Sequence, residues 1–166
     1  MTKGTTLYLA YTAPINPPSA TPVLTLAQCW SGLQLKIRDA PVFVGAIASC
    51  DVLEDSDDER FGTVVREVVF KSDASKSIKE TCVSCWPCKV DFHQPDGSTV
   101  TNTISQGPTG QPDDLCMTYS FQWLLPDVEA GSKKEDEART QYSGMAKMAV
   151  DKSIEAIRRL VGEGKL

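Results

Sequence analysis

A long amphipathic helix ends the sequence, and it restricts the possible folds more than any other feature. Ser132 stands three residues before Glu135, a capping-box pattern that predicts a helix start, and Gly162 and Gly164 predict its end. Because the helix is apolar along one side, that side has to pack against another layer. The side chains on this face are Tyr142, Ala146, Ala149, Val150, Ser153, Ile157, Leu160 and Val161.

The preceding segments are predicted to supply that layer as a sheet. They are rich in β-branched and aromatic residues and are separated by turn signals such as Pro95-Asp96-Gly97. Short turns between successive strands favour an antiparallel meander. The predicted strands are residues 6–12, 50–53, 63–71, 78–84, 89–94, 98–105 and 115–123. The last strand alternates large apolar residues with smaller or polar ones, so one of its faces should be buried.

Two short helices are predicted between the first and second strands. Thr25 and Gln28 form a capping box, and an apolar stripe follows at helical spacing: Leu26, Cys29, Trp30, Leu33 and Ile37. Pro41 ends this helix and is expected to open a second one that runs through Ala48.

The order of these elements predicts an α+β fold in which a curved antiparallel sheet of about six to seven strands grips the C-terminal helix. We find no boundary that suggests a second domain, so residues 1–166 are expected to form a single domain. A twisted sheet rarely closes fully on a straight helix, and the remaining space would be a cavity for an apolar small molecule.

Charge and composition limit the partners. The net charge is −5, and an acidic surface disfavours nucleic acid. No apolar run approaches the roughly 20 residues that span a bilayer, so no membrane insertion is expected. The first residues lack the pattern of a secretory signal, which favours a cytoplasmic protein. Whether the chain forms a homodimer is left open.

Several segments resemble the helix-grip fold of the START/SRPBCC superfamily and, more narrowly, the AtaL-like family of fungal proteins. They are LAYTAPINPP (9–18), GLQLKIR (32–38), VREVVF (65–70), VDFHQPDGS (90–98), MTY (117–119) and MAKMAV (145–150). The resemblance extends over nearly the whole chain. It implies a role in fungal small-molecule metabolism, and it brings no catalytic residues that can be transferred.

Metal and cofactor sites are not expected. Cys82, Cys85 and Cys88 have metal-like spacing, but a structural zinc or an iron–sulfur cluster needs a fourth ligand. In an extended segment Cys85 would point away from the other two, so buried or strand-end thiols are the simpler interpretation. His93 precedes a turn and is expected at the surface. Nucleotide-binding and metalloprotease motifs are absent from the sequence.

Arg66 and Glu67 interrupt an apolar strand and should point to opposite faces of the sheet. A charge on the helix-covered face must be paired or must face a hydrated pocket. Arg66 could anchor a carboxylate or enol oxygen, and Glu67 could act as a general acid or base. The alternative is an exposed residue together with a structural ion pair. Tyr119 is the third predicted catalytic residue.

The predicted ligand-binding residues come from the last strands and the final helix: Asn102, Met117, Phe121, Trp123, Tyr142, Met145 and Ala149. Asn102 is expected to be an accessory donor, and for Tyr119 and Trp123 plain core packing is the favoured explanation, although a pocket wall would use the same residue types. Two functions remain open. One is a cofactor-independent cyclase, isomerase or lyase that acts on a polyketide-like metabolite. The other is a hydrophobic ligand carrier without chemistry.

Overall fold

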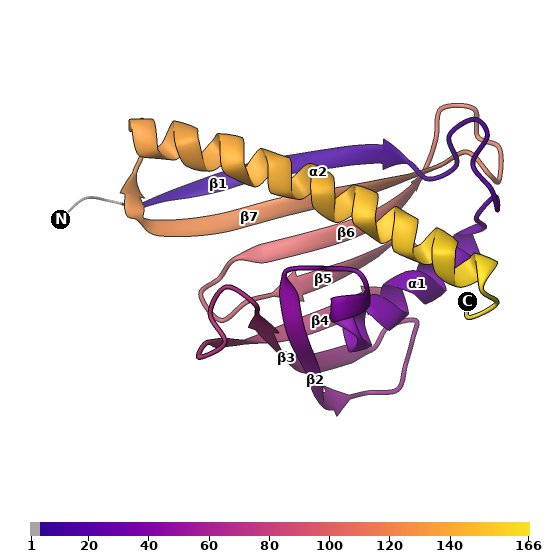
Figure 1. The fold of residues 1–166 in the computed structure, drawn as a ribbon, viewed down its shortest axis with the longest axis horizontal. Coiled ribbons are helices and arrows are strands. Elements are labelled where there is room, and N and C mark those ends of the chain that lie inside the picture. The colour runs from indigo at the N-terminus through magenta and orange to yellow at the C-terminus, as the bar shows by residue number, and fades with distance from the viewer. Residues whose placement is uncertain (1–3) are drawn as a thin grey trace.

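A seven-stranded antiparallel sheet is crossed on one face by a long helix in the computed structural model, which describes residues 4–166 (Figure 1). The element bounds are β1 Gly4–Pro14, α1 Leu26–Arg38, the 3₁₀ turn η1 Ala40–Val42, β2 Ile47–Asp55, β3 Thr63–Phe70, β4 Ser77–Cys85, β5 Lys89–His93, β6 Thr99–Gln106, β7 Leu115–Glu129 and α2 Lys133–Gly162. This arrangement confirms the predicted helix-grip architecture.

The strand order is β1-β7-β6-β5-β4-β3-β2, so β2 to β7 form a meander and β1 joins it beside β7. The β1–β7 pairing runs from Gly4 opposite Glu129 to Pro14 opposite Cys116. At the other edge, the register between β2 and β3 shifts twice, between Ile47 and Ser49 and between Val52 and Glu54. Such irregularities increase local twist and help the sheet to curve around the helix.

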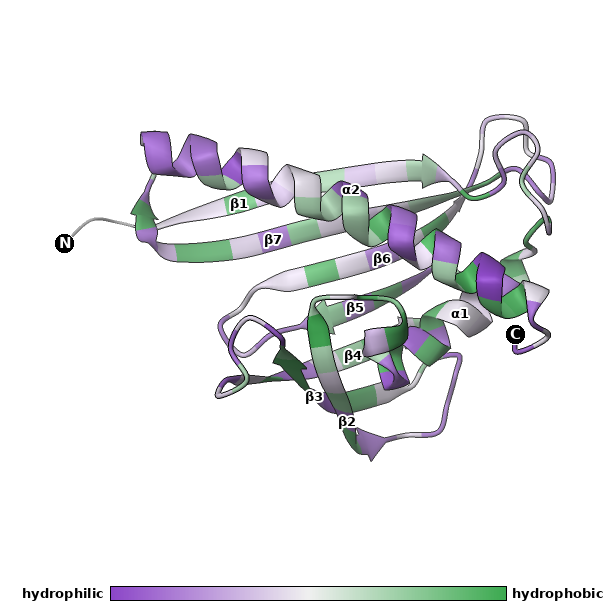
Figure 2. Ribbon diagram, in the orientation of Figure 1, coloured by the Kyte–Doolittle hydropathy of each residue, from purple (hydrophilic) through white to green (hydrophobic). Residues whose placement is uncertain are grey.

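Helix α2 lies over β1 and β7, and its C-terminal end reaches α1 (Figure 1). Its N-terminal turns are hydrophilic, and apolar residues become frequent in its second half (Figure 2). The buried face consists of Ala146, Val150, Ser153, Ile154, Ala156, Ile157 and Leu160, whereas Tyr142, Ala149 and Val161 are half-buried. None of the helices in residues 4–166 combines the length and apolarity needed to cross a membrane.

The two predicted helix starts differ in their capping. At Thr25 the capping box is complete, because the Gln28 N–H donates to Thr25 Oγ1 (3.2 Å) and the Thr25 N–H donates to Gln28 Oε1 (3.0 Å). At Ser132 only half of the box forms: the Glu135 N–H donates to Ser132 Oγ (3.3 Å), but Glu135 Oε2 accepts from the Gly131 N–H (2.6 Å). The Ser132 N–H donates instead to the Glu129 carbonyl, so it is not available for the box.

The predicted second helix is wrong beyond its first turn. Only the 3₁₀ turn at Ala40–Val42 forms, and Ile47 and Ala48 already belong to β2. Ile47 is 5% exposed and lies opposite Phe70, so pairing with β3 outweighs continuation of a helix. Strand β7 also runs on to Glu129, beyond the predicted end at residue 123, because β1 pairs with this extension.

Candidate functional site

A cavity of about 850 Å³ lies between the sheet, α2 and the segment that links α1 to β2. This volume falls within the range of small-molecule sites. The sheet contributes Arg66, Phe70, Glu80, Phe92, Gln94, Val100, Asn102, Tyr119, Phe121 and Trp123. The end of α1 and the following segment contribute Lys36 and residues 41–47, and α2 contributes Tyr142, Met145, Ala146, Met148, Ala149, Lys152, Glu155, Ala156 and Arg159.

Aromatic side chains form one wall of the cavity. The alternation of β7 directs Tyr119, Phe121 and Trp123 to the same face, where the Phe121 and Trp123 rings stack with 5.7 Å between centroids. Tyr142 from α2 continues the row, 5.7 Å from Trp123. This wall offers a flat apolar surface that suits a ring-containing ligand.

The polar end of the cavity is built around the Lys36 ammonium group. Its Nζ donates to Asn102 Oδ1 (2.9 Å), Tyr119 Oη (3.0 Å) and Ser153 Oγ (3.4 Å). These partners come from β6, β7 and α2, so four elements meet at one atom. Lys36 follows Leu33 by three residues on α1, which places it beside the buried stripe of that helix, and it is 6% exposed.

Burial lowers the pKa of Lys36 from 10.5 to about 7, and the nearby Arg66 charge adds to this effect. Glu80 and Cys82 act in the opposite direction but do not cancel it. Within residues 4–166, no carboxylate accepts a hydrogen bond from Lys36 Nζ. Burial also raises the pKa of Tyr119 above its ordinary value, so its hydroxyl keeps its proton near neutral pH. The lysine can therefore change protonation state close to neutrality.

Arg66 lies in the same wall but is held by other groups. Its Nε and Nη2 donate to Glu80 Oε2 at 2.9 and 2.7 Å. Its Nη1 donates to the carbonyl oxygens of Lys36 (2.8 Å) and Ile37 (2.9 Å), which are near the C-terminal end of α1. Glu80 also accepts from Gln94 Nε2 (3.2 Å). Arg66 is thus a buried, paired cation that fixes the end of the helix carrying Lys36.

Asn102 has a buried donor without a partner in the described part of the chain. Its side chain is 0% exposed, and Nδ2 makes no hydrogen bond. Exchanging the amide oxygen and nitrogen would place a donor against the Lys36 ammonium, so the lysine sets the amide orientation. An unpaired buried N–H group is costly. Asn102 lies in the cavity wall, but the absence of accessible surface on its side chain keeps Nδ2 out of contact with a molecule in the cavity.

The structure brings most of the predicted site residues to this cavity and separates two of them. Lining positions are occupied by Arg66, Asn102, Tyr119, Phe121, Trp123, Tyr142, Met145 and Ala149. Glu67 does not join them: strand alternation turns it to the outer face, where it accepts from Ser77 Oγ (2.8 Å). Met117 is fully buried in the hydrophobic core and does not line the cavity. Neither residue therefore belongs to the candidate site.

Sequence analysis did not identify Lys36 or Glu80 as residues of the site. A lysine that follows an apolar stripe residue by three positions is a weak signal, because most such lysines reach solvent. Glu80 lies directly opposite Arg66 in the β3–β4 register, and this register is not readable from either strand alone.

The cysteines and the histidine do not converge. Cys82 is fully buried and burial raises its pKa to about 12, whereas Cys88 is exposed. His93 is exposed at the end of β5, as expected from its position before a turn. Within residues 4–166, no three His, Cys, Asp or Glu side chains gather in a metal-binding group.

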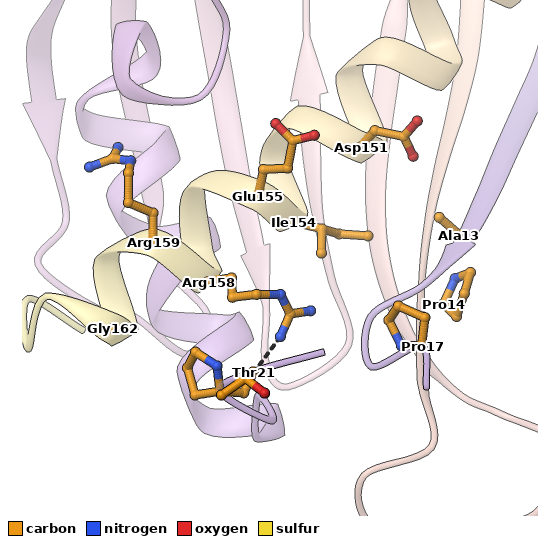
Figure 3. Close-up of a pocket in the computed structure, with 11 residues that line it drawn as sticks. Ala13, Pro14, Pro17, Thr21, Asp151, Ile154, Glu155, Arg158, Arg159 and Gly162 are labelled. Atoms are coloured by element: carbon orange, nitrogen blue, oxygen red, sulfur yellow. Dashed lines mark hydrogen bonds between the residues drawn. The ribbon is translucent and has the colours of Figure 1, made fainter. Parts of the chain in front are cut away.

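A second hollow, of about 640 Å³, lies near the C-terminal part of α2, where Pro14 and Pro17 face Ile154 and Arg158 (Figure 3). Arg158 donates to the carbonyl oxygens of Ile15 and Pro22. The carboxylates of this hollow are paired as well, Asp151 with Lys147 at 2.6 Å and Glu155 with Lys152 at 2.8 Å. Because these charges already have partners, the cavity beside Lys36 is the better candidate site.

Solved structures with a similar fold include a START superfamily protein and di-domain ARO/CYC proteins. A START superfamily protein from Mycobacterium smegmatis has a TM-score of 0.64 at 9% identity, covering 92% of this chain and 98% of that one. The di-domain ARO/CYC StfQ from the steffimycin biosynthetic pathway has a TM-score of 0.62 at 11% identity, covering 95% of this chain. The match covers 52% of StfQ, so this chain spans about half of that two-domain protein. The fold is START-like.

Sequence comparison is more specific. Acetylaranotin biosynthesis cluster protein L from Aspergillus terreus (strain NIH 2624 / FGSC A1156) is 29% identical over 161 residues, which cover 97% of this chain and 94% of the relative. The sequence profile of the AtaL family, described as acetylaranotin biosynthesis cluster protein L, matches residues 9–164. This chain, with its START-like fold and its cavity beside Lys36, therefore belongs to the AtaL family.

Proposed function

We propose that the protein is a cofactor-independent enzyme of secondary metabolism that transfers a proton on an apolar, carbonyl-containing small molecule, in a cyclisation, isomerisation or elimination. The observation that carries this proposal is the position of Lys36 Nζ, a titratable group at the polar end of a largely apolar cavity. The name of the Aspergillus relative and those of the ARO/CYC neighbours support a biosynthetic role. Six free cysteines favour a reducing compartment such as the cytoplasm.

The proposed mechanism uses three side chains. Neutral Lys36 removes a proton from the carbon next to the ligand carbonyl, because a base with a pKa of about 7 is well matched to neutral pH. Asn102 orients the amine, because its Oδ1 lies 2.9 Å from Lys36 Nζ. The Tyr119 hydroxyl, 3.0 Å from Nζ, passes protons to and from the amine. Arg66 positions Lys36 through its backbone carbonyl.

Lys36→Met should abolish proton transfer on a model ketone. We suggest 2-tetralone, a bicyclic ketone with acidic α-protons, and NMR measurement of α-proton exchange with deuterated solvent. The wild-type rate should exceed that of Lys36→Met by about 100-fold, since positioned bases contribute at least this much. Lys76→Met is a matched control, because Lys76 is exposed and pairs only with Asp73. Equal exchange rates for wild type and Lys36→Met would overturn the proposed function.

The alternative function is a carrier that binds an apolar ligand without chemistry. The row of aromatic rings on β7 and α2 favours it, because such a wall needs no reactive group. A carrier would bind 2-tetralone with similar affinity in wild type and Lys36→Met and would accelerate exchange in neither. Binding can be followed by quenching of Trp123 fluorescence, with Trp123→Phe identifying the contribution of that residue.

A further inference from the structure

We infer that Lys36 is also a nucleophile, which forms an imine with the carbonyl carbon of an aldehyde or ketone bound in the cavity. This inference rests on the proposed function, because it requires a carbonyl compound to enter the same site. It names the substrate class and adds a covalent step, which a lysine acting only as a base would not take.

The contacts of Lys36 differ from those of the other paired lysines. Its partners, Asn102, Tyr119 and Ser153, are neutral groups. Elsewhere in residues 4–166, lysines that make short contacts do so with carboxylates, such as Lys147 with Asp151 (2.6 Å) and Lys89 with Asp91 (2.7 Å). A carboxylate stabilises the ammonium form and suppresses nucleophilicity. Lys36 has no carboxylate hydrogen-bonded to it within residues 4–166, and the more distant Glu80 does not cancel the effect of burial on its pKa.

Two features known to activate an amine occur together here. The first is removal from water, since Lys36 is 6% exposed and lies beside the Phe92 ring. The second is a neighbouring cation: the Arg66 guanidinium carbon lies 5.1 Å from the same Phe92 ring. Both conditions favour the neutral amine, which is the form that attacks carbonyl groups. The lowered pKa of Lys36, about 7, agrees with this environment.

The bonding changes balance without an external reagent. The Nζ lone pair forms a bond to the carbonyl carbon while the C=O π electrons move to oxygen, giving a carbinolamine after proton transfer. Nitrogen then loses its second proton, the C–O bond breaks, and the oxygen leaves as water with both protons that came from the amine. The Tyr119 and Ser153 hydroxyls, 3.0 and 3.4 Å from Nζ, are placed to relay these protons. The products are the imine and one water molecule.

Reductive trapping tests this step directly. The full-length protein is incubated at pH 7.5 with 2-naphthaldehyde, an apolar aromatic aldehyde, and sodium cyanoborohydride, and is then analysed by intact mass and peptide mapping. We expect a mass increase equal to the probe minus one oxygen atom, located at Lys36, at least tenfold faster than at any exposed lysine. Lys36→Arg keeps a cation at this position but has no imine-forming amine, and it should lose the label. Lys76→Arg should keep it.

The outcomes separate this inference from the proposed function. Labelling spread evenly over surface lysines, or unchanged in Lys36→Arg, would overturn the imine. Peptide mapping of the labelled wild-type protein shows whether Lys36 is the modified lysine, even if a variant folds poorly. An unlabelled Lys36 in a protein that still accelerates 2-tetralone exchange would leave the proposed function standing without the imine. Selective labelling of Lys36 in a protein that accelerates no exchange would support the nucleophile and contradict the proposed proton transfer.

Discussion

Two cations lie next to each other in the cavity wall, and their surroundings give them different roles. Arg66 donates to the Glu80 carboxylate and to two backbone carbonyls, so all of its nitrogens are engaged. Among residues 4–166, the hydrogen-bond partners of Lys36 Nζ are all neutral, and this lysine can lose its proton near neutral pH. A permanently charged, fully paired arginine stabilises the structure, whereas a lysine without a counter-ion is available for chemistry.

Glu80→Gln should destabilise the protein by about 3 kcal/mol, because it removes the negative charge that compensates the buried Arg66 guanidinium. Glu67→Gln on the adjacent strand makes the same chemical change on the outer face and should cost less than about 0.5 kcal/mol. Guanidinium chloride unfolding followed by circular dichroism measures both. Equal losses of unfolding free energy in the two variants would contradict the assignment of Glu80 as the buried partner of Arg66.

At the scale of elements, the packing of α1 against α2 holds the polar end of the cavity together. Gly32 on α1 faces Ile157 on α2, and an added Cβ would lie 2.5 Å from Ile157 Cγ1. Ile157 is fully buried, so it has little room to move away. The close approach of the two helices brings Lys36 within reach of Ser153.

Gly32→Ala should therefore destabilise the protein by about 1 kcal/mol, since overpacking exceeds the gain in helix propensity. Gly144→Ala is the matched helical control. An added Cβ there meets nothing within 4 Å, and the variant should gain about 0.5–1 kcal/mol. The midpoints of thermal unfolding should shift in opposite directions. A higher midpoint for Gly32→Ala would show that the helices can separate without cost.

The whole molecule is a curved sheet that is only partly filled by its helix. The hydrophobic core lies beneath the C-terminal half of α2 and beneath α1, where Leu33, Ile37 and Ile157 are buried. Along another side of α2, between Tyr142 and Arg159, the space between helix and sheet is left as the cavity, and Met145 and Met148 are exposed beside it. Incomplete closure is thus a property of the complete fold, which no single element provides.

Global stability should increase by about 2 kcal/mol between pH 7 and pH 9. The folded-state pKa of Lys36 is lowered from 10.5 to about 7, so in this window the unfolded chain binds a proton that the folded chain does not. Above pH 9 the trend should reverse, because burial raises the pKa of Cys29 and Cys82 from 9.0 to about 12, and the two protons that their unfolded forms lose outweigh the one that Lys36 binds.

Chemical denaturation at pH 7, 8 and 9 checks this dependence. Lys36→Met should remove most of the increase, whereas Lys76→Met should keep it, because Lys76 is exposed. A wild-type protein whose stability stays constant or falls over this range would show that Lys36 is not held in a desolvated environment.

The sequence by itself determined the family and, apart from the helix expected after Pro41, the element types and their buried faces. Capping at Thr25, the stripe of α1, the alternation of β7 and the amphipathic α2 are local patterns, and local patterns fix which side of each element is buried. These patterns place Tyr119, Trp123 and Tyr142 along the cavity, and their role in ligand binding stays a prediction.

Tertiary structure alone decided which polar groups meet in the wall of the cavity. The alternation of β3 separates Arg66 from Glu67 but does not say which of them faces inward, and the β3–β4 register selects Glu80 as the partner. Lys36 became the centre of the site only because α1, β6, β7 and α2 converge on its amine. Contacts between elements that are distant in the sequence leave no local sequence pattern. Whether a charged side chain is buried depends on all of the elements that pack around it.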